Sequence, residues 1–248
     1  QEDIIRLGTE LVKHIWKDIL DVDLDENFPI MSYEKAMNEY GSDKPDLRFE
    51  MKLIDFDCYV QRSSFNTFLK IIDDGGLTKA IVCPNAENYS RKVIDELTDY
   101  LKTYFDVKGL AWFKVNNGQF EGGISKFFDN ELQKEIIKDL SLEDSQIIFL
   151  MGDNKKRTIQ SMGALRLKLG ERENLIDKNS WKPLWVVDFP LFEKENDKYF
   201  SLHHPFTSPH PNDIELLNSE PENIRSLGYD IVMNGYELGG GSIRIHDR

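Results

Sequence analysis

The residues best suited to chemistry lie near the C-terminus, around the dipeptide Asn234-Gly235. Asn-Gly between two apolar runs is the strongest short-range signal for a β-hairpin with a two-residue type I′ turn. In such a hairpin Val232 faces Glu237, and Asp230 lies two residues further along the same face, so the two carboxylates form a diagonal pair with Cβ atoms roughly 7 Å apart. Two carboxylates on a rigid sheet suit a divalent cation, most naturally Mg²⁺ completed by water and substrate phosphates. The hairpin therefore predicts a metal site at Asp230 and Glu237.

Arg244 is the candidate for binding a carboxylate substrate. It follows Glu237 by an odd number of residues, so a regular strand would place the two side chains on opposite faces. One extra residue in a bulge within glycines 239–241 would bring Arg244, with His246, to the face of the acids. There an Arg can grip a carboxylate through two parallel hydrogen bonds, a geometry that Lys cannot reproduce.

Each of these features also has a plainer interpretation. An Asp and a Glu on a hairpin are commonly solvated or paired with Lys, and three consecutive glycines commonly form a flexible loop. His203 and His204 lack the spacing of paired metal ligands, so a turn with exposed imidazoles competes with a substrate contact. Both interpretations of each feature stay open at the level of the sequence.

The segment 155–172 carries a basic excess in an otherwise acidic chain. A basic surface of this kind can contact a phosphate backbone. At about 100° per residue, however, the charges spread around a helix instead of forming a stripe, which favours an ordinary solvated helix. The residues are Lys155, Lys156, Arg157, Arg166, Lys168 and Arg172.

Composition limits the class of protein. The chain has 248 residues, 31 Lys plus Arg and 44 Asp plus Glu, hence a net charge of −13, and its 40% apolar content predicts one large folded domain or two modest ones. The longest apolar run, 147–151, is far shorter than the roughly 20 residues that span a bilayer, which predicts no membrane insertion. Cys58 and Cys83 stand apart with no clustered His, so we expect reduced thiols and a cytoplasmic protein.

Recognisable elements must position these residues. The first twenty residues predict an amphipathic helix, and a second short helix follows Ser32 as N-cap and stops at Gly41. Strands are expected at 77–82, 110–115, 146–151, 184–189 and 199–202. Helices are expected after Ser90 and after Asp153 or Asn154. Because the chain begins at Gln1, without Met or a targeting segment, we expect a piece of a longer protein.

Five blocks of sequence resemble the bacterial-type aspartyl-tRNA synthetases, a class II family. The blocks lie in the family's order at 28–48, 163–170, 184–190, 203–207 and 234–244. The resemblance implies an α+β fold, in which a partial class II antiparallel catalytic sheet carries an inserted α+β (GAD) domain. It implies catalytic segments at 1–48 and 173–248 and the insertion at 49–172. The Gly-Ala-Asp signature of the insertion stands here as Gly152-Asp153-Asn154, which departs from the family.

The resemblance also implies a reaction. The family activates L-aspartate with ATP to aspartyl-adenylate and transfers the aspartyl group to tRNA(Asp). Carried over by position, Arg244 clamps the aspartate side chain, and His203 or His204 lies on a substrate-binding loop. Glu237 binds ATP through Mg²⁺ with help from Asp230, and no further catalytic side chain is assigned. The partners implied are L-aspartate, ATP and tRNA(Asp), with a homodimeric full-length protein.

Two other functions compete with this one. The family's motif 1, the arginines of motifs 2 and 3 and the anticodon-binding barrel are not in these residues, so we expect no aminoacylation by the chain alone. A non-catalytic tRNA-associated binding module is the first alternative, because a similar insertion occurs in an amidotransferase subunit. A metal-dependent enzyme acting on a small carboxylate is the second. The blocks at 203–207 and 234–244 resemble the synthetases only.

Overall fold

The computed structural model describes residues 1–196 and 198–246, and the chain forms two compact units. Unit 1 comprises Gln1–Met37, Asp43–Arg48 and Lys178–Arg248. Unit 2 comprises Asn38–Ser42 and Phe49–Asp177. The assignment of 49–172 as a GAD insertion stays a prediction. None of the helices described combines the length and the apolarity needed to cross a membrane.

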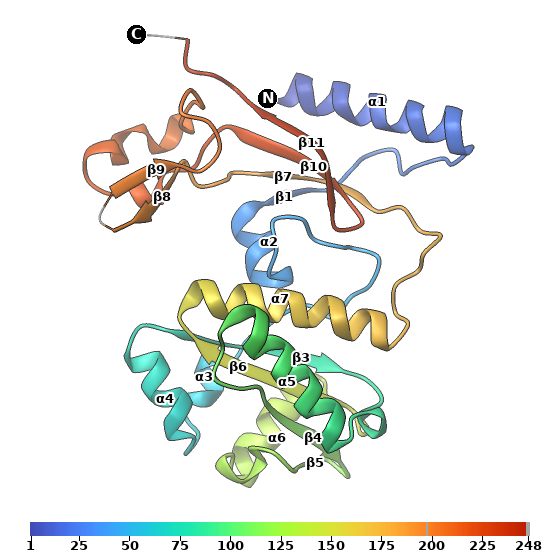
Figure 1. Ribbon diagram of the computed structural model, residues 1–248, viewed down its shortest axis with the longest axis vertical. Coiled ribbons are helices and arrows are strands. Elements are labelled where there is room, and N and C mark those ends of the chain that lie inside the picture. The colour runs from blue at the N-terminus through green and yellow to red at the C-terminus, as the bar shows by residue number, and fades with distance from the viewer. Residues whose placement is uncertain (197, 247–248) are drawn as a thin grey trace. The chain divides into compact units, whose positions relative to one another are not determined.

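Unit 1 is built on a four-stranded sheet of order β1-β7-β10-β11 (Figure 1). β1 runs parallel to β7, whereas the β7–β10 and β10–β11 pairs are antiparallel. A separate β8–β9 ribbon and two 3₁₀ segments complete the unit. Its elements are α1 (Glu2–Leu20), β1 (Ile30–Ser32), the first part of α2 (Tyr33–Tyr40, of which Asn38–Tyr40 belong to unit 2), β7 (Pro183–Val187), β8 (Phe192–Glu195), β9 (Lys198–Ser201), the 3₁₀ segments Pro211–Asn218 and Pro221–Asn223, β10 (Gly228–Met233) and β11 (Tyr236–Ser242).

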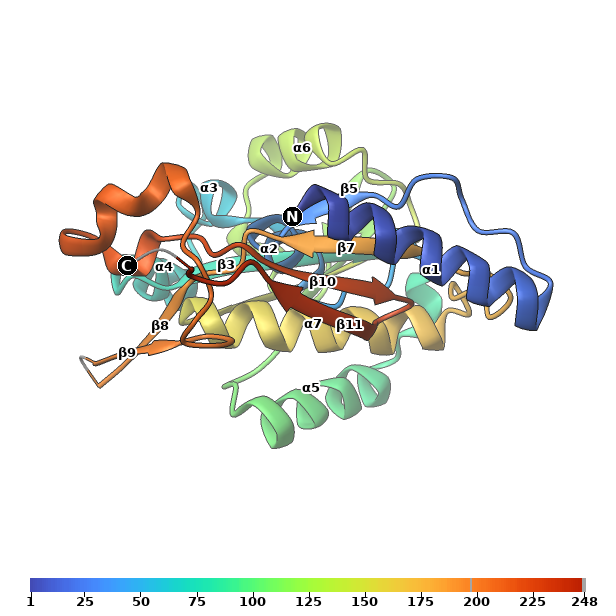
Figure 2. The same ribbon diagram turned by 90° about the horizontal axis from the view of Figure 1, so that it is seen from above.

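Helix α1 covers one face of this sheet. Val12 and Trp16 pack with Trp185 of β7 and Ile231 of β10 in a small apolar core. Both views show α1 lying along the β10–β11 hairpin (Figure 1 and Figure 2). Because side chains alternate along a strand, the neighbours of Ile231 in sequence, Asp230 among them, point to the opposite face of the sheet. The functional residues predicted on β10 are therefore on the face that α1 leaves open.

Unit 2 is a five-stranded sheet, order β2-β3-β6-β4-β5, with every pair antiparallel. Figure 1 shows α5 and α7 together on one side of it. The elements are β2 (Ile54–Asp55), α3 (Asp57–Val60), α4 (Asn66–Asp73), β3 (Leu77–Cys83), the 3₁₀ turn Ala86–Asn88, α5 (Arg91–Phe105), β4 (Ala111–Asn116), β5 (Gln119–Glu121), the 3₁₀ turn Ser125–Phe127, α6 (Asn130–Asp139), β6 (Ile147–Asp153) and α7 (Lys155–Arg172).

Strand β6 supplies both cores of unit 2. Its residues Ile147, Phe149 and Met151 face α5 and α7, whereas Ile148 and Leu150 face the apolar cluster that includes residues of α3, α4 and α6. A strand buried on both faces loses the polar alternation of a surface strand, which explains the continuous apolar run in the sequence. The antiparallel sheet of unit 2 and the mostly antiparallel sheet of unit 1, each packed with helices, confirm the expected α+β class.

The expected helix caps are confirmed. Oγ of Ser32 accepts a hydrogen bond from the backbone N of Lys35 at 3.2 Å, and Gly41 ends α2 with φ +70°. Ser90 caps α5, and Asn154 rather than Asp153 caps α7. These side chains satisfy backbone N–H groups that the first turn of a helix leaves without a partner.

One basic residue of α7 overturns the expectation of a solvated helix. Arg166 is 1% exposed, and its guanidinium donates to the carbonyl oxygens of Phe49, Glu50 and Met51 at 2.8–2.9 Å. The same group lies 3.8 Å from the ring centroid of Phe49 and 4.9 Å from that of Tyr40. Charge spacing on a helix cannot reveal such burial, because the accepting carbonyls come from a distant loop.

We expect Arg166→Met to lower the free energy of unfolding of unit 2 by about 3 kcal/mol, since three carbonyl groups lose their donor in a buried site. Lys168→Met on the same helix is the matched control, because the Lys168 ammonium is exposed and lies over the Tyr100 ring at 4.4 Å. Chemical denaturation of the chain measures both variants. Equal stability of the two variants would contradict a structural role for Arg166.

Candidate active site

The β10–β11 hairpin has the predicted turn and pairing. Asn234 and Gly235 both have positive φ, 55° and 88°, as a type I′ turn requires. Val232 pairs with Glu237, and Met233 pairs with Tyr236. The Asn234 side chain accepts from the backbone N of Lys182 at 3.0 Å and so ties the turn to the segment that enters β7. This register confirms that Glu237 and Asp230 share one face.

The bulge is present but lies one residue before the glycines expected to hold it. Ile231 pairs with Gly239 while Val232 pairs with Glu237, so Leu238 is the extra residue. The glycines have another use. A Cβ at Gly240 would lie 2.0 Å from Oδ1 of Asp230, and one at Gly241 would lie 3.0 Å from Oη of Tyr229. Glycine is needed here so that side chains of β10 can lie across β11.

Asp230 is the buried member of the acidic pair. It is 6% exposed, and the structure, over 1–196 and 198–246, gives its carboxylate no hydrogen bond or ion pair. Burial raises the pKa of Asp230 to about 6, and the negative charges of Glu237 and Asp43 act in the same direction. Lys44 opposes the shift. Asp230 is therefore a carboxylate in a site that lacks sufficient positive charge.

Lys44 brings positive charge to this face from far away in the sequence. Its Nζ lies 2.9 Å from Oε2 of Glu237, and this hydrogen bond raises the pKa of Lys44. Within the loop that carries Lys44, the buried carboxylate of Asp46 accepts from N, Nε and Nη2 of Arg48 at 2.6–3.2 Å, which holds the backbone of the loop in a turn. A Cβ at Gly235 would lie 3.7 Å from Cβ of Asp46, so the loop lies against the hairpin turn.

His203 belongs to the same electrostatic group. Its ring packs edge-on against Phe189 with centroids 4.6 Å apart. Partial burial of the ring lowers the pKa of His203, and the negative charges of Asp43 and Glu237 oppose that shift. The imidazole is consequently biased toward its neutral form near the acids, although the residue as a whole keeps contact with solvent.

His204 instead contacts Arg244. Nη1 of Arg244 lies 2.5 Å from Nδ1 of His204, and the backbone N of Phe206 donates to the same Nδ1 at 3.1 Å. Because both neighbours are donors, Nδ1 must be the unprotonated nitrogen and Nε2 carries the proton. Arg244 also forms an antiparallel bridge with Thr207. The structure thus joins two of the predicted aspartate-binding residues in one exposed contact.

An ion pair anchors the loop that carries the two histidines. Asp213 accepts from Nε and Nη2 of Arg225 at 2.8 and 2.9 Å and from the Arg225 backbone N at 3.0 Å. The Arg225 carbonyl in turn accepts from the backbone N of His210 at 2.8 Å. These hydrogen bonds lower the pKa of the Asp213 carboxyl to about 2.

The Asp213–Arg225 pair predicts a pH-dependent stability. The folded pKa of Asp213 is about 2 against an ordinary 3.8, so its stabilisation is present above pH 4 and is lost as the pH falls through 2. We expect Asp213→Asn to cost about 1 to 2 kcal/mol at pH 7, because Arg225 is partly solvated, and almost nothing at pH 2. Denaturant titrations at both pH values measure this, with the exposed Asp3→Asn as control. A cost that does not change with pH would contradict the assignment.

The acidic pair suits a hard divalent cation. The described residues contain no group of three or more His, Cys, Asp and Glu that could hold a metal ion by itself. Mg²⁺ is commonly held by one or two carboxylates together with substrate phosphates, which matches a pair of acids with no third ligand. The buried, unpaired carboxylate of Asp230 is the observation that supports the fit. Asp230 and Glu237 are therefore the residues that would hold the ion.

Sequence reasoning missed Asp43 and Lys44. They lie in the polar loop that follows Gly41, where the sequence predicts no site residue. The sequence did indicate that an acid on a hairpin commonly pairs with a lysine, and Glu237 does form an ion pair with Lys44. No pattern of neighbouring residues identified which lysine pairs with Glu237.

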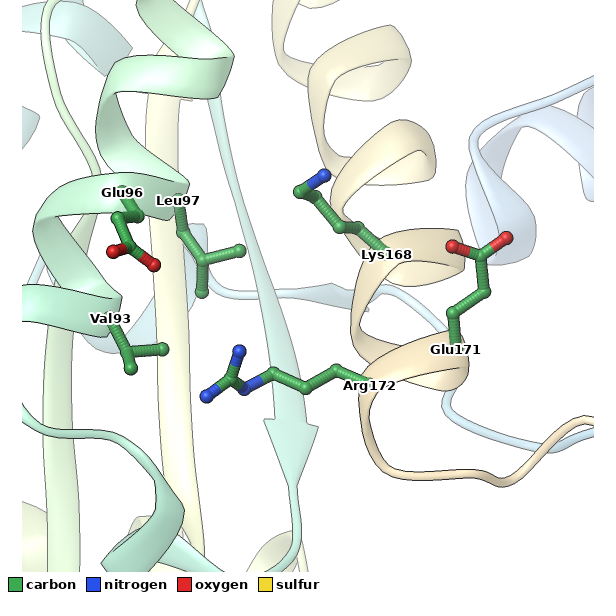
Figure 3. A pocket seen from close by; sticks show the side chains of 6 residues that line it. All are labelled: Val93, Glu96, Leu97, Lys168, Glu171 and Arg172. Carbon is green, nitrogen blue, oxygen red and sulfur yellow. The ribbon is translucent and has the colours of Figure 1, made fainter.

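The structure also has a surface hollow that lies away from the predicted site residues. Figure 3 shows this hollow in unit 2, between α5 and α7, where Val93 and Leu97 are flanked by charged side chains of both signs. Those charged residues are Glu96, Lys168, Glu171 and Arg172. No residue predicted to bind aspartate, ATP or metal lines it.

Comparison with known proteins defines the class. All of residues 1–248 match the family of class II tRNA synthetases (D, K and N), and the chain belongs to that family. Aspartate--tRNA ligase of Halalkalibacterium halodurans is 44% identical over 251 residues, and that of Staphylococcus haemolyticus is 45% identical. A protein of Bacillus cytotoxicus named aspartate--tRNA(Asp/Asn) ligase is 44% identical. Each match covers 100% of this chain and 42% of the relative.

Proposed function

We propose that this chain is part of an aspartate–tRNA ligase and forms one side of the site that activates L-aspartate with ATP. The observation that carries the proposal is the face of the β10–β11 hairpin, where Glu237 pairs with Val232 and shares its face with the buried Asp230. Arg244 follows the end of β11 and contacts His204, which lies in the loop after β9. A cation-binding acidic pair followed by a guanidinium suits a substrate pair of nucleotide and carboxylate.

In the proposed reaction an oxygen of the aspartate α-carboxylate attacks the α-phosphorus of ATP, and pyrophosphate leaves. Arg244 would hold the side-chain carboxylate through two N–H donors and so orient the amino acid. Glu237 and Asp230 would hold Mg²⁺, which neutralises phosphate charge when it is bound. His204, whose Nδ1 contacts Nη1 of Arg244, would lie on the substrate-binding loop and support that guanidinium.

The extent of the match separates the proposed function from the alternatives. It covers the whole chain, including the blocks at 203–207 and 234–244, and not unit 2 alone. A binding module related only through the insertion would not need those blocks. The tRNA(Asp) partner, the homodimer and the cytoplasmic location follow from the same family membership and are part of the proposal.

The test is ATP–pyrophosphate exchange, measured on the full-length protein. We expect exchange that depends on L-aspartate and on Mg²⁺. Asparagine is the matched control, because it has the same shape without the side-chain charge that Arg244 would bind. Exchange supported equally by asparagine, or without any amino acid, would contradict the proposal.

A further inference from the structure

An ion pair occupies the carboxylate to which the proposed function assigns the cation. Nζ of Lys44 lies 2.9 Å from Oε2 of Glu237. The two side chains are 39% and 38% exposed, so the ammonium can leave for solvent without opening the core. Lys also has a long flexible stem with rotatable N–H donors, which allows its charge to move while its backbone stays fixed. The fixed part here is the loop held by Asp46 and Arg48.

The charge balance shows that Lys44 alone does not neutralise this face. Asp43, Asp230 and Glu237 offer three negative charges against one ammonium. Asp230, which is 6% exposed, has no hydrogen-bond or ion-pair partner within 1–196 and 198–246. A divalent cation would balance the remaining two charges. The buried, unpartnered carboxylate is thus a second sign, besides the acidic cluster itself, that the face takes a cation.

We infer that Lys44 is a resident counter-ion, which competes with a divalent cation for Glu237 and makes binding of the bare cation weak. The inference rests on the proposed function for the identity of the site. A cation that is bound to a polyphosphate competes with Lys44 more effectively than the bare cation does, because the phosphate oxygens offer the displaced ammonium a new anionic partner. Lys44 therefore acts as a positioning residue that couples cation binding to the nucleotide.

The expected magnitude follows from Coulomb's law. An ammonium and a divalent cation that share one carboxylate repel each other across a few ångströms of partly hydrated protein. With screening by solvent and salt, removal of the ammonium should strengthen cation binding by a factor on the order of ten. If Lys44 instead held Glu237 in place for the metal, its removal would weaken binding. The sign of the change therefore separates the two roles.

The experiment measures Mn²⁺ binding to the chain of residues 1–248, from the electron paramagnetic resonance signal of free Mn²⁺. We expect Lys44→Met to bind Mn²⁺ about tenfold more tightly than the unsubstituted chain. Lys44→Arg, which keeps the charge, should bind as weakly as the unsubstituted chain. Lys13→Met is the matched control, because Lys13 forms a comparable 3.0 Å pair with Glu10 on α1. The double variant Lys44→Met with Glu237→Gln should lose the gain.

Two results would overturn the inference. One is equal or weaker Mn²⁺ binding by Lys44→Met, and the other is no detectable binding by any variant. Lys13→Met removes the same charge from the chain, so a gain confined to Lys44→Met cannot come from the change in net charge. No aspartate or ATP enters this measurement, so its failure is distinguishable from failure of the proposed function, which only the exchange assay on the full-length protein reports.

Discussion

Arg244→Lys in the full-length protein should lower aspartate-dependent ATP–pyrophosphate exchange about 100-fold or more. A Lys keeps the positive charge but offers a point donor, whereas the guanidinium offers a planar fork that matches both oxygens of a carboxylate. Loss of one hydrogen bond to a charged group, together with looser orientation of the reacting carboxylate, accounts for a loss on the order of 3 kcal/mol in transition-state binding. We expect the KM for aspartate to rise and that for ATP to change little.

Arg62→Lys is the matched control for this substitution. Arg62 is an exposed arginine of unit 2 that pairs through both terminal nitrogens with Glu135. It makes the same kind of bidentate contact, so its replacement reports what an Arg-to-Lys change costs the protein in general. Arg244→Lys activity within about threefold of the Arg62→Lys activity would remove Arg244 from the aspartate site.

Glu237→Gln should have the second large effect, a fall in exchange of about 100-fold with a higher requirement for Mg²⁺. Gln keeps the shape of the side chain and removes its charge, so the acidic pair is reduced to Asp230 alone. Fixed charge around the phosphates is typically worth two to three orders of magnitude when one group is removed. Titration of exchange against Mg²⁺ at saturating aspartate measures both parts of the prediction.

Glu10→Gln provides the comparison, because Glu10 also accepts from a lysine, Lys13, at 3.0 Å. That pair lies on α1, which covers the other face of the sheet, so its loss should leave exchange near the original rate. If Glu237→Gln lowered exchange at every Mg²⁺ concentration by the same factor, with no change in the Mg²⁺ midpoint, Glu237 would not be a ligand of the ion.

Local sequence was sufficient for the hairpin and the helix caps. The Asn234-Gly235 turn sets which residues of β10 and β11 face each other, because positive φ at both positions fixes the two-residue loop. Ser32, Ser90 and Asn154 begin their helices by the same kind of short-range hydrogen bond. Each of these predictions needed only residues a few positions apart.

The sequence-based predictions were wrong where residues distant in the sequence determine the local structure. Leu238 carries the bulge instead of a glycine, because the glycines are needed to make room for Asp230 and Tyr229 on the facing strand. Arg166 is buried because the loop at Phe49 to Met51 presents three carbonyl oxygens to it. Neither the position of the bulge nor the burial of Arg166 can be predicted from the local pattern of charge and hydrophobicity.

By itself the sequence determined the family, the α+β class and the placement of Asp230 and Glu237 on one face of a hairpin. Tertiary structure alone decided the charge around that face. Lys44 and Asp43 reach it from a loop that lies between the two segments of unit 2 in the sequence, and the burial that raises the pKa of Asp230 exists only when the sheet is assembled. Electrostatic interactions depend on distance and burial in three dimensions, so a chain position can indicate that a charge exists but not which opposite charge it meets.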